Sequence, residues 1–246
     1  GEPAINPVPR QMMRAAIAEA AREHGGGGDV SIEIGIAGGE ALAARTWNPR
    51  LGIVGGLSIL GTTGVVVPFS CAAWIHSIHR GIDVARASGM RHVAGCTGST
   101  SERAVQKLYG LPEAALLDMG DFAGGLLKYL RAHPLPRLTI AGGFAKMSKL
   151  AAGHLDLHSG RSQVDAAWLA QELAGRGAGA ETVARAAKAN SALEVLQLAA
   201  AAGIDIGGGI AARARATALQ ALGGAAIAVE AMVFDREGQL VGRSGP

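Results

Sequence analysis

Residues 91–102 read RHVAGCTGSTSE, and this stretch decides the fold class. Arg91–Ala94 is predicted to be a short strand, the small and hydroxyl residues of 95–101 a turn, and Glu102–Leu108 a helix. The same order of elements returns further along the chain, with strands predicted at 115–119 and 138–141 and helices at 121–133 and 146–152. Because a helical crossover brings the chain back to the same edge of a sheet, such alternation is typical of parallel strands.

The segments on either side of this pattern extend it. Helices are predicted at 70–87 and through most of 164–223, and a closing hairpin is predicted at 225–234 and 239–243. We therefore predict an α/β fold in which residues 70–246 form a mainly parallel, Rossmann-like sheet with crossover helices.

Residues 1–69 follow a different pattern. Asn6–Glu23 is a predicted helix, since Asn6 can cap it and Pro7 suits its first turn. Apolar residues then alternate with small or polar ones, as they do in a strand, at Val30, Ile32, Ile34 and Ile36. The chain begins with Gly1 rather than Met, so we expect a truncated N-terminus. We predict that residues 1–69 are an α+β part, the remainder of a truncated first domain, which packs against the α/β domain.

The composition narrows the class of protein. Hydrophobic residues make up 49% of the 246 residues, the net charge is +3, and aromatic residues contribute 4%. Basic residues do not cluster, which argues against a nucleic-acid partner, and no apolar run is long enough to span a bilayer. Two cysteines, Cys71 and Cys96, are too few for a disulfide framework, so a cytoplasmic protein is expected. The oligomeric state stays open, a homo-oligomer included.

Glycine is the residue type that stands out, and residues 48–68 are the richest part. Five glycines and three hydroxyl residues lie within an apolar run at 48–66. Such residues let the backbone pass close to a flat or extended ligand. The alternative is a glycine-rich turn packed between helices, and the spacing alone does not decide between the two.

In open α/β sheets, ligands lie beyond the carboxyl ends of the strands, and this rule selects three further turns. The turn at 95–102 precedes a helix whose N–H groups attract anions, and Cys96 there is better explained as a small buried thiol than as a nucleophile. In the turn at 118–125 a carboxylate can accept hydrogen bonds from a ribose or an amine, but we favour Asp121 as a helix N-cap and Asp118 as solvated. In the turn at 141–149, Lys146 and Lys149 share a helical face and suit an anionic ligand, with solvated lysines as the alternative.

A fifth pattern is His154-x-Asp156-x-His158. On a strand these three side chains share one face and can meet a single ligand. They suit a proton-handling role, whereas ordinary polar contacts are the alternative that we favour from the residues alone.

Several of these motifs together resemble one known family. Matching segments are residues 1–10 (GEPAINPVPR), the glycine-rich run at 48–66, and the turns at 95–102, 119–122 and 142–146. In order and context they are similar to the cobalt-precorrin-5B C1-methyltransferases of anaerobic cobalamin biosynthesis. The resemblance covers essentially the whole chain, although members of that family carry a further N-terminal portion before the segment that begins here at Gly1.

The resemblance implies an activity and a set of ligands. It implies that a methyl group moves from S-adenosylmethionine, the co-substrate, to C1 of a cobalt-containing tetrapyrrole, cobalt-precorrin-5B, giving cobalt-precorrin-6A. Direct displacement needs alignment rather than a protein nucleophile. No protein-bound metal is expected, because methyl transfer requires none and the cobalt arrives inside the substrate.

With this activity in view, each motif is assigned a role. The donor is expected at Gly95, Thr97, Gly98, Ser99, Asp118, Gly120 and Asp121. The macrocycle and its carboxylates are expected at Arg10, Arg50, Gly55, Gly56, Ser58, Gly61, Thr62, Lys146, Lys149 and Arg161. His154, Asp156 and His158 are the catalytic candidates, as a base or facing the cobalt. Two other classes stay open: a non-catalytic tetrapyrrole carrier, and a Rossmann-like oxidoreductase, which the absence of a clean GxGxxG disfavours.

Overall fold

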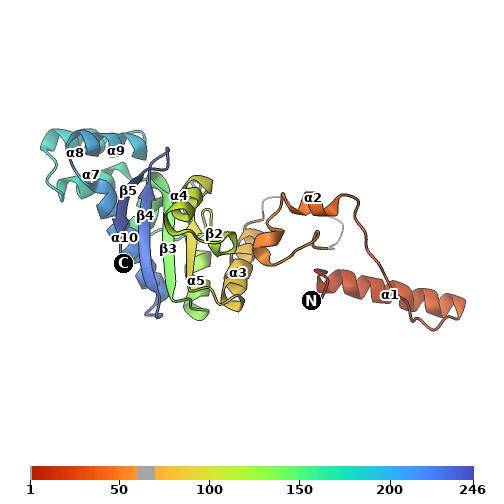
Figure 1. Cartoon of the computed structure of the whole chain (residues 1–246). Coiled ribbons are helices and arrows are strands. Elements are labelled where there is room, and N and C mark those ends of the chain that lie inside the picture. Colours follow the sequence, from red (N-terminus) through yellow and green to blue (C-terminus); the bar gives the residue numbers. More distant parts are fainter. Residues whose placement is uncertain (1, 60–69) are drawn as a thin grey trace. The chain divides into compact units, whose positions relative to one another are not determined.

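The computed structural model describes residues 2–59 and 70–246. The chain divides into two compact units, Gly1–Ser70 and Cys71–Pro246 (Figure 1).

The second unit is built on a five-stranded sheet in the order β2-β1-β3-β4-β5. Its strands are β1 (His92–Cys96), β2 (Leu116–Asp118), β3 (Arg137–Gly143), β4 (Ala228–Phe234) and β5 (Leu240–Ser244). The first four run parallel, and β5 pairs antiparallel with β4 across a turn that contains Gly238. The predicted α/β fold with a mainly parallel sheet is confirmed.

Helices follow the strands at nearly the predicted places. They are α3 (Cys71–Ala87), α4 (Ser99–Tyr109), the 3₁₀ turn η2 (Glu113–Ala115), α5 (Ala123–Ala132), α6 (Phe144–Ala151), α7 (Ala166–Ala174), α8 (Ala180–Ala186), α9 (Ala192–Ala201) and α10 (Ile206–Leu222). Among the described residues no helix is long and apolar enough to cross a membrane.

The sheet is covered on both faces, as parallel sheets are. Alternate residues of each strand contribute side chains to two separate apolar clusters. One contains Leu138 and Leu126 and lies beneath α3, α5 and α10; the other contains Cys96 and Val105 and lies beneath α4 (Figure 1). Burial on both faces explains why apolar residues occupy both alternate sets of positions in these strands.

One fully buried charge lies on the α4 face. Glu230 of β4 is 0% exposed and accepts hydrogen bonds from the hydroxyls of Tyr109 (2.6 Å) and Thr139 (2.9 Å). Arg243 Nε lies 2.6 Å from its other oxygen, and Arg137 Nη2 lies 3.3 Å from the first. These contacts tie α4, β3, β4 and β5 together around one carboxylate.

The described part of the first unit contains helices and irregular segments. It contains α1 (Pro7–His24), α2 (Gly39–Ala43) and the 3₁₀ turn η1 (Asn48–Leu51), so the helix predicted at Asn6–Glu23 is confirmed. The strand predicted at 30–36 is wrong. Its alternate apolar side chains are between 44% and 61% exposed, and among residues 2–59 the one β-type pairing joins Ile5 to Ile59. Alternation in the sequence makes a strand only where a second strand accepts its backbone hydrogen bonds.

Candidate functional site

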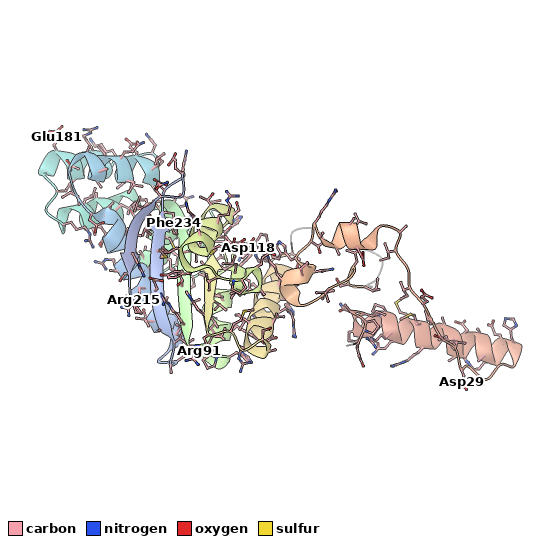
Figure 2. All side chains as sticks on the ribbon, in the orientation of Figure 1. Asp29, Arg91, Asp118, Glu181, Arg215 and Phe234 are labelled. Carbon is pink, nitrogen blue, oxygen red and sulfur yellow. The ribbon has the colours of Figure 1, made fainter. Side chains whose placement is uncertain are left out.

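The sheet reverses its strand order between β1 and β3. From β1 the chain moves outward to β2 and then returns to the other side of β1 to form β3. The connections therefore leave β1 and β3 in opposite directions, and in open α/β sheets a crevice opens at this point, beyond the carboxyl ends of the strands. Figure 2 shows this edge of the sheet, with Asp118 and Phe234 toward it and Arg91 at the opposite edge.

Two adjoining hollows, of about 390 and 260 Å³, lie at this edge and form what we call the strand-end cleft. Both are lined by Thr97, Thr100, Gly143, Phe234 and Asp235. These residues follow or end β1, β3 and β4. The larger hollow is closed on one side by α9, at residues 191–193 and 196.

Two helices begin at the strand-end cleft without a side-chain cap. The N-cap of α4 is Gly98 and that of α6 is Gly143, neither of which has a side chain to accept the first N–H groups. The Ser101 hydroxyl, the nearest alternative in α4, donates to the Gly98 carbonyl instead (2.8 Å). Uncapped N–H groups and the positive ends of two helix dipoles favour an anion in this cleft.

Lys146 brings an ammonium group to the same wall. Its Nζ donates to the Thr97 carbonyl (3.0 Å) and lies 3.0 Å from Asp121 Oδ1. The turns after β1, β2 and β3 are thereby joined through one ammonium group. Asp121 does not cap α5, whose N-cap is Phe122, so the N-cap interpretation of Asp121 is wrong.

Asp118 ends β2 directly beside β1. Its Cα is in register with that of Cys96, and its Oδ1 accepts a hydrogen bond from Gly120 N (3.2 Å). It follows the β1–α4 turn by roughly 20 residues, the spacing at which an acidic residue meets a nucleotide ribose in dinucleotide-binding folds. Its position beside β1 suits the same task here.

The glycines predicted around the donor have different roles. Gly98, with Ser99, lines the smaller hollow. Gly95 lies within β1, where a Cβ would collide with Leu126 of α5, so its small size serves packing. Gly120 has φ of 53° and a Cβ there would lie 3.1 Å from the ring of Trp74. Gly95 and Gly120 therefore support the edge without lining the cleft.

The three catalytic candidates lie on a loop after α6, not on a strand, so their predicted common face does not form. Asp156 accepts hydrogen bonds from His158 N (3.1 Å) and from Arg161 Nη1 (2.7 Å). Burial acts to raise the pKa of Asp156, but these bonds outweigh it and hold the pKa below its usual value. His154 and His158 are exposed, and within residues 2–59 and 70–246 no group of three or more His, Cys, Asp and Glu side chains could hold a metal ion.

Lys149 differs from Lys146 in its surroundings. Only 7% of Lys149 is exposed, and its Nζ donates to the Leu157 carbonyl (2.8 Å). Burial lowers the pKa of Lys149. The side chain thus anchors the loop after α6 and does not line the strand-end cleft.

Arg161, also predicted to bind substrate, pairs with Asp156 and does not line the strand-end cleft. The other predicted substrate residues belong to the first unit. Gly55 and Gly56 line an open groove of about 710 Å³ together with the exposed isoleucines 32, 34 and 36. Ser58 Oγ lies 3.5 Å from Asn48 Oδ1, and Arg10 donates to the carbonyls of Ile5 and Pro3. Arg50 lies in η1. Gly61 and Thr62 lie outside the described residues.

Sequence reasoning missed Asp235 and Arg236, which follow β4 and line the larger hollow. The strand-end rule would have selected them if 225–234 had been placed in the parallel sheet rather than only in a hairpin. No local sequence pattern predicts that α9 lines the cleft, because the position of α9 depends on how the helices pack in the folded protein.

The chain is similar to proteins of one family. Residues 1–68 match the family model described as CbiD, and residues 156–245 match the one described as CbiD, C-terminal domain. A protein of Paramagnetospirillum magneticum is 63% identical over 242 residues, covering 98% of this chain and 67% of the relative. A protein of a Bradyrhizobium species is 65% identical over 243 residues, covering 99% and 65%. A protein of Brucella canis is 62% identical over 243 residues, covering 99% and 66%.

All three relatives are named cobalt-precorrin-5B C(1)-methyltransferase. The chain spans about two thirds of their length. No solved structure matches it.

Proposed function

The chain belongs to the CbiD family, and on that premise we propose that it transfers a methyl group from S-adenosylmethionine to C1 of cobalt-precorrin-5B, giving cobalt-precorrin-6A in anaerobic cobalamin biosynthesis. The names of its relatives support the reaction. The protein needs no metal of its own, because the cobalt arrives in the tetrapyrrole substrate. We place the enzyme in the cytoplasm, where free thiols such as Cys71 and Cys96 stay reduced.

The observation that carries the proposal is the strand-end cleft at the β1/β3 reversal, where two uncapped helices and Lys146 meet. The donor carries a carboxylate, an amine and a ribose. Its carboxylate suits the N–H groups at the starts of α4 and α6, and its amine suits the carboxylate of Asp235. Asp118, at the end of the neighbouring strand, suits the ribose hydroxyls.

Direct methyl transfer does not depend strongly on any single side chain. An electron pair of the ring carbon forms the new C–C bond while the C–S pair stays on sulfur, so the protein must mainly hold two reactants in line. Lys146 contributes by joining the turns after β1, β2 and β3, which keeps the walls of the cleft in register. Cys96 is buried and lies beneath α4, so it does not act as a methyl acceptor.

Equilibrium binding to the demethylated donor, S-adenosylhomocysteine, tests the proposal by calorimetry. We expect the full chain to bind it, Lys146→Ala to weaken that binding, and Lys107→Ala, at the far end of α4, to leave it unchanged. Two other classes of protein predict different ligands. If only NAD binds, an oxidoreductase replaces the proposal; if neither binds, while a cobalt tetrapyrrole does, a carrier replaces it.

A further inference from the structure

A second groove lies on the same unit, outside the strand-end cleft. It encloses about 490 Å³ between α3, α5 and the loop after α6. Its floor and walls are mostly apolar, from Ile75, Phe122, Ala132 and Leu155. Polar side chains stand among them: Cys71, His79, Lys128, Tyr129, Asp156 and Arg161. We call it the α3–α5 groove.

His79 is held in a fixed orientation on the wall of this groove. Its ring stacks on Tyr129 at 4.1 Å, and Tyr129 stacks on His133 at 4.1 Å. The Tyr129 hydroxyl in turn donates to Asp83 Oδ1 (2.8 Å), which fixes the middle ring of the stack. Because the imidazole is already held in place, little conformational entropy is lost when it binds a ligand.

The surroundings of His79 favour its neutral form, which can donate an electron pair. Burial lowers its pKa, while a hydrogen bond to the backbone of Gly125 acts in the opposite direction more weakly. The neutral ring can donate its N–H to that backbone and keep a lone pair on the second nitrogen. Imidazoles that bind metals are oriented in this way, with the other nitrogen bound to a carbonyl or carboxylate.

Cations stand at the rim. Lys128 of α5 is exposed, and Arg161 of the loop after α6 has its Nη1 2.7 Å from Asp156 Oδ2. Phe122, which lines the groove, directly follows Asp121, the partner of Lys146 at the strand ends.

We propose that the α3–α5 groove binds the cobalt-containing acceptor, with His79 facing the cobalt as an axial ligand and Lys128 and Arg161 binding peripheral carboxylates. The apolar floor suits the macrocycle, and the rim cations suit its acidic arms. Coordination at the centre of the ring would fix its plane, so that rotation alone decides which carbon meets the donor. His79 is thus a positioning residue, and the inference rests on the proposed function only for the identity of the acceptor.

Electron paramagnetic resonance of the full chain with cobyrinic acid, in its Co(II) state and without donor, tests the coordination. We expect splitting of the cobalt signal by one nitrogen nucleus. His79→Phe, which keeps a ring to stack on Tyr129, should abolish that splitting, whereas His76→Phe, at an exposed position of the same helix, should keep it. Wild-type protein without nitrogen splitting, or splitting that persists in His79→Phe, overturns the proposal.

A titration with the same compound tests the rim. Lys128→Ala should weaken binding about five-fold, as expected for an exposed ion pair, and Lys107→Ala should not. The methyl ester of cobyrinic acid should bind to the wild type and to Lys128→Ala with the same affinity. If the two proteins differ in affinity by the same factor for the acid and for the ester, Lys128 does not bind a carboxylate. Because donor is absent, these results do not depend on binding of S-adenosylhomocysteine, so the inference and the proposed function can fail separately.

Discussion

The ammonium of Lys146 lies 3.0 Å from a carboxylate oxygen of Asp121, which joins the turn after β3 to the turn after β2. That oxygen is buried and has no hydrogen-bond partner among the described residues, so the ion pair is its main compensation. The contact crosses β1, which lies between these two strands in the sheet. The strand-end cleft is therefore held together by a pair of residues far apart in sequence.

Removal of the Lys146 ammonium should lower both the free energy of unfolding and the affinity for the donor. Lys146→Met leaves Asp121 uncompensated, and we expect a loss of about 1 kcal/mol in the free energy of unfolding, since both side chains are partly exposed. Urea unfolding measures this loss. The double variant Lys146→Met/Asp121→Asn should recover most of it, because no unpaired charge remains. A double variant as unstable as the sum of the two single variants would show that the two side chains do not interact.

Replacement of Asp118 should affect binding of S-adenosylhomocysteine and not binding of the cobalt tetrapyrrole. Asp118→Asn should weaken S-adenosylhomocysteine binding about ten-fold, the loss expected for a hydrogen bond to a charged acceptor, and leave binding of cobyrinic acid unchanged. Asp156→Asn, in the loop after α6, is the matched control and should not alter binding of S-adenosylhomocysteine. Calorimetry with each ligand checks both statements. Equal effects of Asp118→Asn on the two ligands would indicate a general loss of structure at the edge.

Two glycines of the β1–α4 turn should respond differently to a methyl group. At Gly95 a Cβ would collide with Leu126, and overpacking of this kind costs about 1–3 kcal/mol. Gly98 has an extended backbone, with φ of 165°, and nothing within 4 Å of an added Cβ. We therefore expect Gly95→Ala to lower the midpoint of urea unfolding and Gly98→Ala to leave it close to that of the wild type. Equal midpoints would contradict the packing role of Gly95.

Glu230 should make stability depend on pH. Burial acts to raise its pKa, but hydrogen bonds from Tyr109, Thr139 and Arg243 outweigh burial, so the pKa lies below its usual value. A carboxylate with a lowered pKa stabilises the fold above its unfolded pKa, about 4.3, and this contribution is lost as the pH falls through the folded value. Acid unfolding of the wild type should therefore include a step that depends on this group.

Glu230→Gln should remove that step. It should also lower the free energy of unfolding at pH 7 by about 3 kcal/mol, because two arginines lose their buried partner. Unfolding in urea at several pH values measures both effects. Tyr109→Phe is the milder control, since it removes one hydrogen bond and leaves the charge pairs in place, and it should cost about 1 kcal/mol. A Glu230→Gln protein with the same pH dependence as the wild type would assign the acid sensitivity to other carboxylates.

Local pattern was enough for much of the second unit. The order of strand, glycine turn and helix at 91–102 returns at 115–133 and 138–152, and each element lies within a few residues of its predicted place. Such patterns succeed because strand and helix periods reflect burial of nearby side chains on one or two faces. The strand-end rule then selected Thr97, Gly98 and Lys146 at the cleft, because carboxyl ends of parallel strands share one edge.

Local pattern failed where the outcome depended on a distant partner. The alternation at 30–36 is that of a strand, but within the described residues no neighbouring strand pairs with it. Lys146 and Lys149 are three residues apart on one helix, yet one ammonium reaches the cleft and the other is buried against the Leu157 carbonyl. Helical spacing is the same for both, so the surrounding loop decides.

The fold class, the family and the strand ends where we propose that the donor binds could be predicted from sequence, because they follow from periodicity and from motifs that are continuous along the chain. The order of strands, the reversal between β1 and β3, the wall formed by α9 and the groove beside His79 were decided only by tertiary structure. Each of these depends on which elements meet after the chain has folded, and a contact between residues far apart in sequence leaves no periodic trace in either segment.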